Sequence, residues 1–237
     1  MSIRGRTPLD RRWPDNDNFV AIAKTWQNDA SSILLSYIWK GYDLLHDEVL
    51  SQIEPNLTDD ELERSISQLL ESRIHKVMTG DEPFYVQHEV YEFETRQPSP
   101  AQPPQYDIAF VLNENPRIVW PLEAKVLRSD RSVASYINDL KNEFLSCRYA
   151  PFSSEGAMLG YLFSGVPENV FLHIEKKVPC KLHHHLDFSE RNHKYSDHTR
   201  CVPTGKPYLS HFRCQHLIFC INKEMGSGEY LSLSENS

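Results

Sequence analysis

Two short β-rich segments carry charged side chains inside otherwise apolar runs, and these side chains are the first candidates for chemistry. Residues 106–112 contain Asp107, and residues 118–127 contain Glu123 and Lys125. Because side chains alternate between the two faces of a strand, Glu123 and Lys125 project from the same face while their apolar neighbours point the other way. If Asp107 lies on an adjacent strand, two carboxylates and one ammonium group form a cluster.

Such a cluster has the groups needed to cut phosphodiester bonds. Carboxylate oxygens suit Mg²⁺ and similar hard cations, and a lysine beside them can hold a phosphate or an attacking water. The alternative is a cross-strand ion pair between Asp107 and Lys125, which contributes little to stability where it is exposed. The elements that position the three residues therefore decide between the two interpretations.

An amphipathic helix is predicted ahead of these strands, over residues 57–79. Thr58 and Glu61 form a capping box at its start, and Gly80 provides its end. Glu63 falls inside the apolar arc of this helix, where an unpaired carboxylate would be costly. Two explanations stay open: the helix dipole favours an acid in the first turn, or Glu63 points into a metal site. Glu71 lies beyond the edge of the same arc and is the substitute.

The remaining pattern predicts one large α/β unit with additions at both ends. Residues 1–16 read as a loose arginine-rich arm, and residues 17–53 as one helix or as two that divide at Asn28-Asp29. After the capped helix we expect a strand over 84–94, the two charged strands, a helix over 133–147 and a strand over 157–163. Three consecutive strands followed by a helical crossover to a fourth make a mixed sheet flanked by helices.

The C-terminal region is less regular. Residues 170–178 fit a helix or a strand, residues 211–221 fit a last strand, and residues 222–237 fit a disordered tail. The predicted division is an N-terminal arm and helical layer over 1–56, a core over 57–165, and a C-terminal extension packed on the core over 166–237.

Composition places the chain among ordinary globular proteins, with 40% hydrophobic and 24% charged residues in 237. No apolar run approaches the ~20 residues of a membrane span, and the start lacks the apolar core of a signal peptide. We therefore expect a cytoplasmic protein without a membrane partner. The five cysteines are an odd number without a CxxC pair, which is typical of reduced thiols.

Charge is unevenly distributed along the chain. The net charge is −8, but residues 1–12 carry +3, residues 13–170 carry −13, and residues 171–215 carry +4 with seven histidines. The acidic part is read as solubility charge. The basic region could line a nucleic-acid backbone through its lysines and arginines: Lys176, Lys177, Lys181, Arg191, Lys194, Arg200 and Lys206.

The order of the elements and the positions of the charged residues resemble the PD-(D/E)XK nuclease superfamily. The resemblance rests on Asp107 in the second strand, on the Glu-Ala-Lys triplet at 123–125 in the third and on an acid in the preceding helix. It covers roughly residues 57–164. The aspartate follows Tyr106 rather than proline, a common variation of this pattern. The resemblance implies a restriction-endonuclease-like core of order αβββαβ.

The resemblance also implies roles for individual residues. Asp107 and Glu123 would bind Mg²⁺ or Mn²⁺, with the carbonyl of Ala124 as a further ligand. Lys125 would activate or orient the attacking water, and Glu63 would be the helix acid. The implied activity is metal-dependent hydrolysis of phosphodiester bonds in DNA, by an endonuclease or an exonuclease. Bacterial defence and mobile-element processing are contexts that rest on fold analogy.

Contacts with nucleic acid are expected beside this centre. Tyr136, Asn138 and Lys141, on the helix after the site, could contact phosphates, and Arg200 could face the active site from outside the core. The alternative from another class is a non-catalytic nuclease-fold subunit that binds DNA or a protein partner in a larger complex, and a homodimer is also open. Docking of this kind is favoured by tryptophans predicted to be exposed in the N-terminal part: Trp13, Trp26 and Trp39.

Histidines and cysteines crowd the segment 180–216 and suggest zinc at first sight. Cys180 and His183, and likewise His198 and Cys201, are separated by two residues, a spacing found in zinc sites. Since no CxxC pair accompanies them, we favour loop histidines and buried thiols and expect no zinc.

Overall fold

A mixed β-sheet of seven strands organises the structure, a computed structural model that describes residues 17–48, 57–92, 94–95, 103–178 and 180–221. Together with four α-helices it makes an α/β fold within these residues. The elements follow in this order: α1 (Asp17–Glu48), α2 (Asp59–Val77), β1 (Phe84–Tyr91), β2 (Gln105–Leu112), β3 (Val119–Leu127), α3 (Ala134–Asp139), the π-helical turn η2 (Leu140–Phe144), β4 (Glu155–Leu162), α4 (Pro167–Lys177), β5 (His183–His184), the 3₁₀ turn η3 (Leu186–Phe188), β6 (His193–Thr199) and β7 (His211–Cys220).

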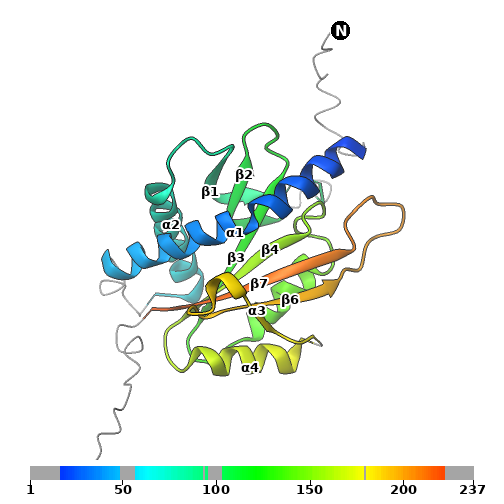
Figure 1. Ribbon diagram of the computed structural model, residues 1–237. Coiled ribbons are helices and arrows are strands. Elements are labelled where there is room, and N and C mark those ends of the chain that lie inside the picture. Colours follow the sequence, from blue (N-terminus) through cyan, green and yellow to red (C-terminus); the bar gives the residue numbers. More distant parts are fainter. Residues whose placement is uncertain (1–16, 49–56, 93, 96–102, 179, 222–237) are drawn as a thin grey trace, which may run out of the picture.

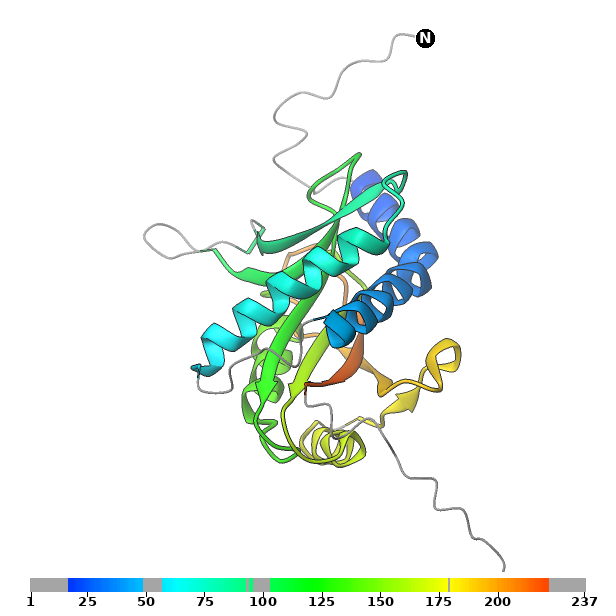
Figure 2. The ribbon, with the colours of Figure 1, turned by 90° about the vertical axis from the view of Figure 1, so that its left-hand side faces the viewer.

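The strands lie in the order β1-β2-β3-β4-β7-β6-β5. The first three are antiparallel neighbours, β3, β4 and β7 run parallel, and β6 and β5 return antiparallel. Helices α1 and α2 cover one face of the sheet and α3 and α4 the other (Figures 1 and 2). The predicted succession of helix, three strands, helix and strand is confirmed for α2 to β4. No helix in the described ranges is long and apolar enough to cross a membrane.

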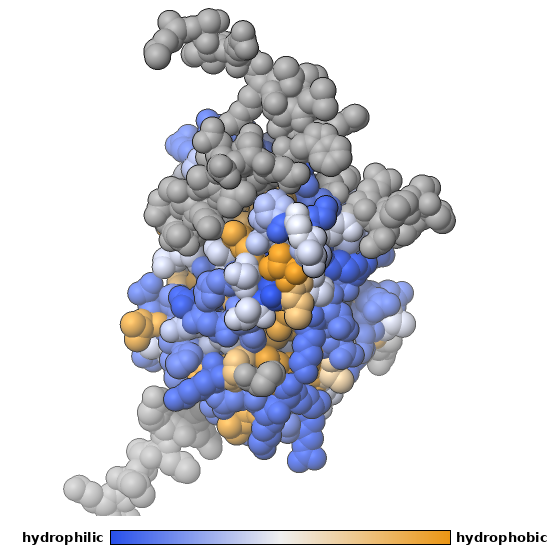
Figure 3. Space-filling model, turned by 90° about the vertical axis from the view of Figure 1, so that its right-hand side faces the viewer, coloured by the Kyte–Doolittle hydropathy of each residue, from blue (hydrophilic) through white to orange (hydrophobic). Residues whose placement is uncertain are grey.

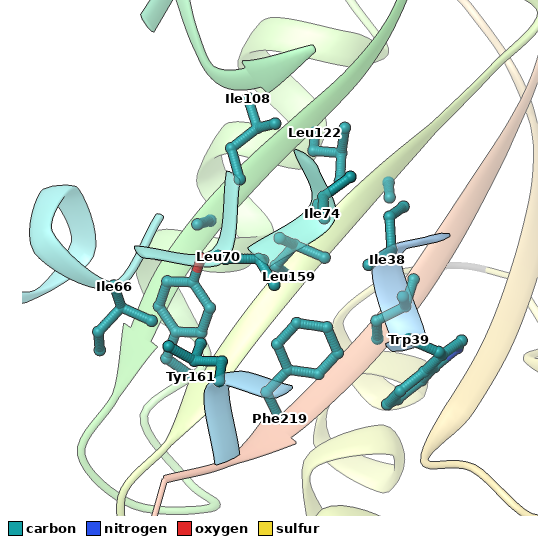
Figure 4. Packing of buried hydrophobic residues seen from close by; sticks show 14 of the residues in the cluster. Ile38, Trp39, Ile66, Leu70, Ile74, Ile108, Leu122, Leu159, Tyr161 and Phe219 are labelled. Atoms are coloured by element: carbon teal, nitrogen blue, oxygen red, sulfur yellow. The ribbon is translucent and has the colours of Figure 1, made fainter. Parts of the chain in front are cut away.

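Side-chain alternation along β3 separates the two layers. Leu122, Ala124 and Val126 are buried under α1 and α2, while Val119 and Leu127 of the same strand belong to the apolar cluster on the other face. Figure 4 shows how residues from both helices meet the strands in this layer: Ile38, Trp39, Ile66, Leu70, Ile74, Ile108, Leu122, Leu159, Tyr161 and Phe219. The charged side chains of β3 are thereby directed away from the larger apolar cluster.

Helix α1 is continuous, so of the two alternatives the structure has the single helix, and Asn28-Asp29 does not break it. A long buried face outweighs the weak helix propensity of two residues. Trp39 belongs to that face: it is 3% exposed, and its Nε1 donates to His193 Nδ1 at 3.2 Å. The expectation that Trp39 is exposed for docking is therefore wrong. Trp13 lies outside the described residues, and so does the side chain of Trp26.

The capping box of α2 is confirmed. The Thr58 hydroxyl accepts from the Glu61 amide at 3.3 Å, while the Thr58 amide donates to the Glu61 carboxylate at 2.9 Å. The helix ends at Val77, and Gly80 follows with a φ of +90°, a conformation that glycine adopts without strain. The local signals thus place the helix on the chain correctly.

The helix predicted over 133–147 is shorter and changes type. It is α-helical only to Asp139, and a π-helical turn continues to Phe144. The Leu145 amide donates to the Leu140 carbonyl at 3.0 Å, the five-residue step of a π-helix.

The C-terminal region completes the sheet. Strand β7 pairs in parallel with β4 along its length, and β6 pairs with β7, so residues 183–220 add three strands to the core sheet. The open choice at 170–178 is decided for a helix, α4. The predicted tail over 222–237 and the arm over 1–16 lie outside the described residues.

Candidate active site

Strands β2 and β3 part where the predicted site residues begin. Their pairing ends at Ile108 and Leu122. Beyond that point the Ala124 amide donates to Asp107 Oδ2 at 2.7 Å, so the Asp107 carboxylate takes the position of a backbone acceptor. This bond ties Asp107 to the Glu-Ala-Lys triplet and leaves a gap between the two strands for polar side chains.

Helix α2 brings Glu63 into this gap. Lys125 Nζ donates to Glu63 Oε1 at 2.7 Å, and the Val126 amide donates to Glu63 Oε2 at 3.3 Å. Glu71 turns elsewhere and pairs with His75 at 3.4 Å. Of the two helix acids left open by the sequence, Glu63 is the one that meets the strand residues.

Lys125 lies between three carboxylates. Its Nζ is 2.7 Å from Glu63 Oε1, 3.1 Å from Glu123 Oε1 and 3.1 Å from Asp139 Oδ2. Asp139 was missed by the sequence reasoning. One signal could have found it: Asp139 lies three residues after Tyr136 on the helix expected beside the site, and residues three apart share a helix face.

The cluster holds four carboxylates and a single ammonium group, and the pKa values of Glu63, Asp107, Glu123 and Lys125 are shifted. Burial raises the pKa of Glu123 well above its usual value, and Asp107 adds to the effect. Burial also raises the pKa of Asp107, against the pull of Lys125. The same cause brings the pKa of Glu63 to about 7. Burial lowers the pKa of Lys125, but the surrounding carboxylates, Glu123 first, raise it by more.

The donor set fits a hard divalent cation. Glu123 Oε2 is buried without a hydrogen-bond partner, which is costly for a carboxylate unless a cation or proton joins it. Oxygen ligands of this kind match Mg²⁺ or Mn²⁺, and Asp107 and Glu123 are the residues that would hold the ion. Within the described residues no three His, Cys, Asp or Glu side chains are arranged around a common metal position. In this arrangement the Lys125 ammonium supplies the neutralising charge. The carbonyl of Ala124 stays a predicted ligand.

Tyr136 does not contact nucleic acid, and that prediction is wrong. The side chain is fully buried, and its hydroxyl lies 3.2 Å from the Met158 carbonyl and 2.8 Å from His216 Nδ1. It anchors α3 to the sheet instead. Asn138 and Lys141, on the same helix and its π-turn, are exposed, so contact of these two with phosphates stays a prediction.

Arg200 is also interior, and its predicted place at the active site or on a nucleic-acid surface is wrong. It is 4% exposed, and its guanidinium donates to the carbonyls of Ala150 at 2.9 Å and Ser153 at 3.0 Å. The guanidinium also lies over the Phe212 ring, 4.2 Å from its centroid. Burial lowers the pKa of Arg200 to about 10. The charged guanidinium therefore holds the loop at residues 150–153 through hydrogen bonds to its carbonyls.

The histidine-rich segment forms hydrogen-bonded chains. Ser196 Oγ lies 2.7 Å from both His198 Nε2 and His216 Nε2, and Cys180 Sγ lies 3.8 Å from His198 Nε2. Burial lowers the pKa of His216 to about 3, so this imidazole is neutral at pH 7. These side chains therefore hydrogen-bond to one another within the folded protein.

No protein-family model, no curated protein and no solved structure matches this chain.

Proposed function

We propose that this chain is a metal-dependent nuclease with a restriction-endonuclease-like core of the PD-(D/E)XK type, acting on phosphodiester bonds in DNA. One observation carries the proposal: Glu63, Asp107, Glu123 and Lys125 converge from α2, β2 and β3. An isolated Glu-x-Lys triplet in a strand is common by chance. Packing does not require a half-buried aspartate and a helix acid to meet that triplet.

Each residue has a distinct role in this hypothesis. Asp107 and Glu123 hold the divalent ion, which, when bound, polarises the scissile phosphate and lowers the pKa of a water. Lys125 orients that water or neutralises the charge that develops on the phosphate oxygens. Glu63 fixes the Lys125 ammonium through the contact at 2.7 Å. Such positioning is effective because the groups are already held in place before the substrate binds.

The test is cleavage of supercoiled, linear and single-stranded DNA with Mg²⁺ or Mn²⁺. Glu123→Gln and Lys125→Ala should lower the rate by about 10²-fold or more, the usual loss when one electrostatic group of a catalytic centre is removed. Glu71→Gln is the matched control, because it removes a carboxylate from the same helix without touching the cluster. Equal rates in all four proteins, with or without chelator, would contradict the assignment.

A second candidate is a nuclease-fold subunit that binds DNA or a protein partner without cutting. The observation in its favour is that three carboxylates lie within 3.1 Å of Lys125 Nζ. They occupy the three N–H donors of the ammonium group, so none is left to contact a substrate. This subunit would bind DNA in a salt-dependent way and show no metal-dependent cleavage. Cleavage that depends on Glu123 excludes it.

A further inference from the structure

Four exposed lysines lie together on the α3–α4 side of the molecule, and we name them the lysine surface: Lys141, Lys176, Lys177 and Lys181. None of the four has a carboxylate of the described residues within ion-pair distance. Their positions are linked by a direct contact, because Lys141 Nζ donates to the Lys177 carbonyl at 2.9 Å. The π-turn and the end of α4 therefore meet, and α4 lies along the lower margin of the sheet (Figure 1).

The lysine surface is close to the candidate active site along the chain. Lys141 lies two residues after Asp139, whose carboxylate is 3.1 Å from Lys125 Nζ. From there the lysines continue to the end of α4 and the residues after it. In the view from the right-hand side of Figure 1, the lower part of the molecule, where α4 lies, is mostly hydrophilic (Figure 3).

Three other basic residues of the same region are paired or buried. Arg191 pairs with Asp43 at 2.7 Å, and Lys194 pairs with Glu168 at 2.7 Å. Arg200 is buried. In a chain of net charge −8, the lysine surface therefore gathers positive charge that is not paired with a carboxylate of the described residues. Lys176 and Lys177 lie in the last turn of α4, where the helix dipole stabilises positive charge. The helix dipole does not account for Lys181, which lies beyond that turn.

We propose that the lysine surface is the track on which the sugar-phosphate backbone of the nucleic acid lies. This inference rests on the proposed function and specifies where its substrate binds. A centre with four carboxylates repels a polyanion, so the attraction must come from cations outside the centre. Ammonium groups contact phosphates without reading sequence, and such contacts fix the position of the strand on the protein. The strand then crosses the π-turn and reaches Lys125.

Salt dependence gives the expected size of the effect. Each phosphate neutralised by a lysine contributes about 0.9 to the slope of log K against log salt concentration for duplex DNA. Removing two lysines of the track should therefore lower the slope by roughly 2.

The experiment compares two double variants of the full chain by fluorescence anisotropy with a labelled DNA duplex and a labelled single strand, in EDTA. Lys176→Gln with Lys181→Gln removes two charges from the lysine surface and keeps the Lys141 contact. Lys40→Gln with Lys76→Gln removes the same charge from exposed positions on α1 and α2, which cover the other face of the sheet. Thermal unfolding checks that both variants are folded.

The first variant should bind more weakly with a reduced salt slope, while the second should match the wild type. Equal loss in both variants would show a general charge effect and overturn the proposal, and so would unchanged binding in the first variant or no DNA binding by the wild type. Polyglutamate that competes as well as DNA, with the same lysine dependence, would mean an acidic protein partner and also overturn it. DNA binding that depends on these lysines, without cleavage in Mg²⁺, would refute the nuclease but retain the lysine surface.

Discussion

Replacing Glu63 by glutamine should change how stability depends on pH. The carboxyl group ionises in the folded protein with a pKa of about 7, whereas 4.5 is its usual value, and burial is the main cause. A carboxyl with a raised pKa contributes stability at low pH that is lost as the pH rises through the folded pKa. The wild type should therefore lose stability as the pH rises from about 4.5 through about 7 on account of Glu63. Glutamine keeps the shape and the acceptor for Val126 and does not ionise.

The size of the effect follows from the two pKa values. A difference between 4.5 and about 7 corresponds to about 3 kcal/mol in the free energy of unfolding. The Glu63 side chain is only 16% exposed, so solvent screening reduces this figure little. Relative to the wild type, Glu63→Gln should gain about 3 kcal/mol across this pH range.

Urea unfolding in EDTA, followed by circular dichroism at several pH values, measures the difference. Glu190→Gln is the matched control, because it removes the same charge from an exposed turn and should give a curve parallel to the wild type. A constant difference between Glu63→Gln and the wild type, or one that grows toward low pH, would refute the reasoning about the buried cluster.

Three further predictions concern packing, the buried arginine and the metal. Gly41→Val should lower the free energy of unfolding by about 1–3 kcal/mol in urea titrations, since a Cβ there would lie 2.6 Å from Ile74 Cγ1. Gly80→Ala is the control: nothing lies within 4 Å of its Cβ, so it measures backbone strain alone. Arg200→Met should cost about 3–5 kcal/mol in the same assay, because it leaves loop carbonyls without donors; a loss below about 1 kcal/mol would contradict the role assigned to it. Mg²⁺ at about 100 times its dissociation constant should stabilise the wild type by about 2.7 kcal/mol in thermal shift measurements, and Glu123→Gln should abolish this gain; equal gains would place the ion elsewhere.

Local patterns in the sequence were sufficient where neighbours along the chain set the structure. The capping box at Thr58 and Glu61 predicts where α2 begins, because its hydrogen bonds join residues three apart. Alternation along β3 predicts that Glu123 and Lys125 share a face, because the strand repeat is two residues. The order of elements from α2 to β4 follows from such signals taken in turn.

Burial of polar and aromatic side chains was decided by partners far away in sequence. Trp39 meets His193 and Tyr136 meets His216, and the donors of Arg200 reach carbonyls near residue 150. A polar or amphipathic residue reads as exposed until its partner is known, since an exposed position satisfies it equally well. These three residues were misplaced for that reason.

The sequence by itself therefore determined the two charged strands, the capped helix and their order, because each depends on local geometry. The tertiary structure alone decided that Glu63 rather than Glu71 meets Lys125, and that Asp139 joins them where α3 gives way to a π-turn. Glu63 and Lys125 are 62 residues apart, and helical periodicity places Glu63 on a face without saying which strand that face meets. That choice depends on how α2 packs across the sheet, which is a property of the whole core.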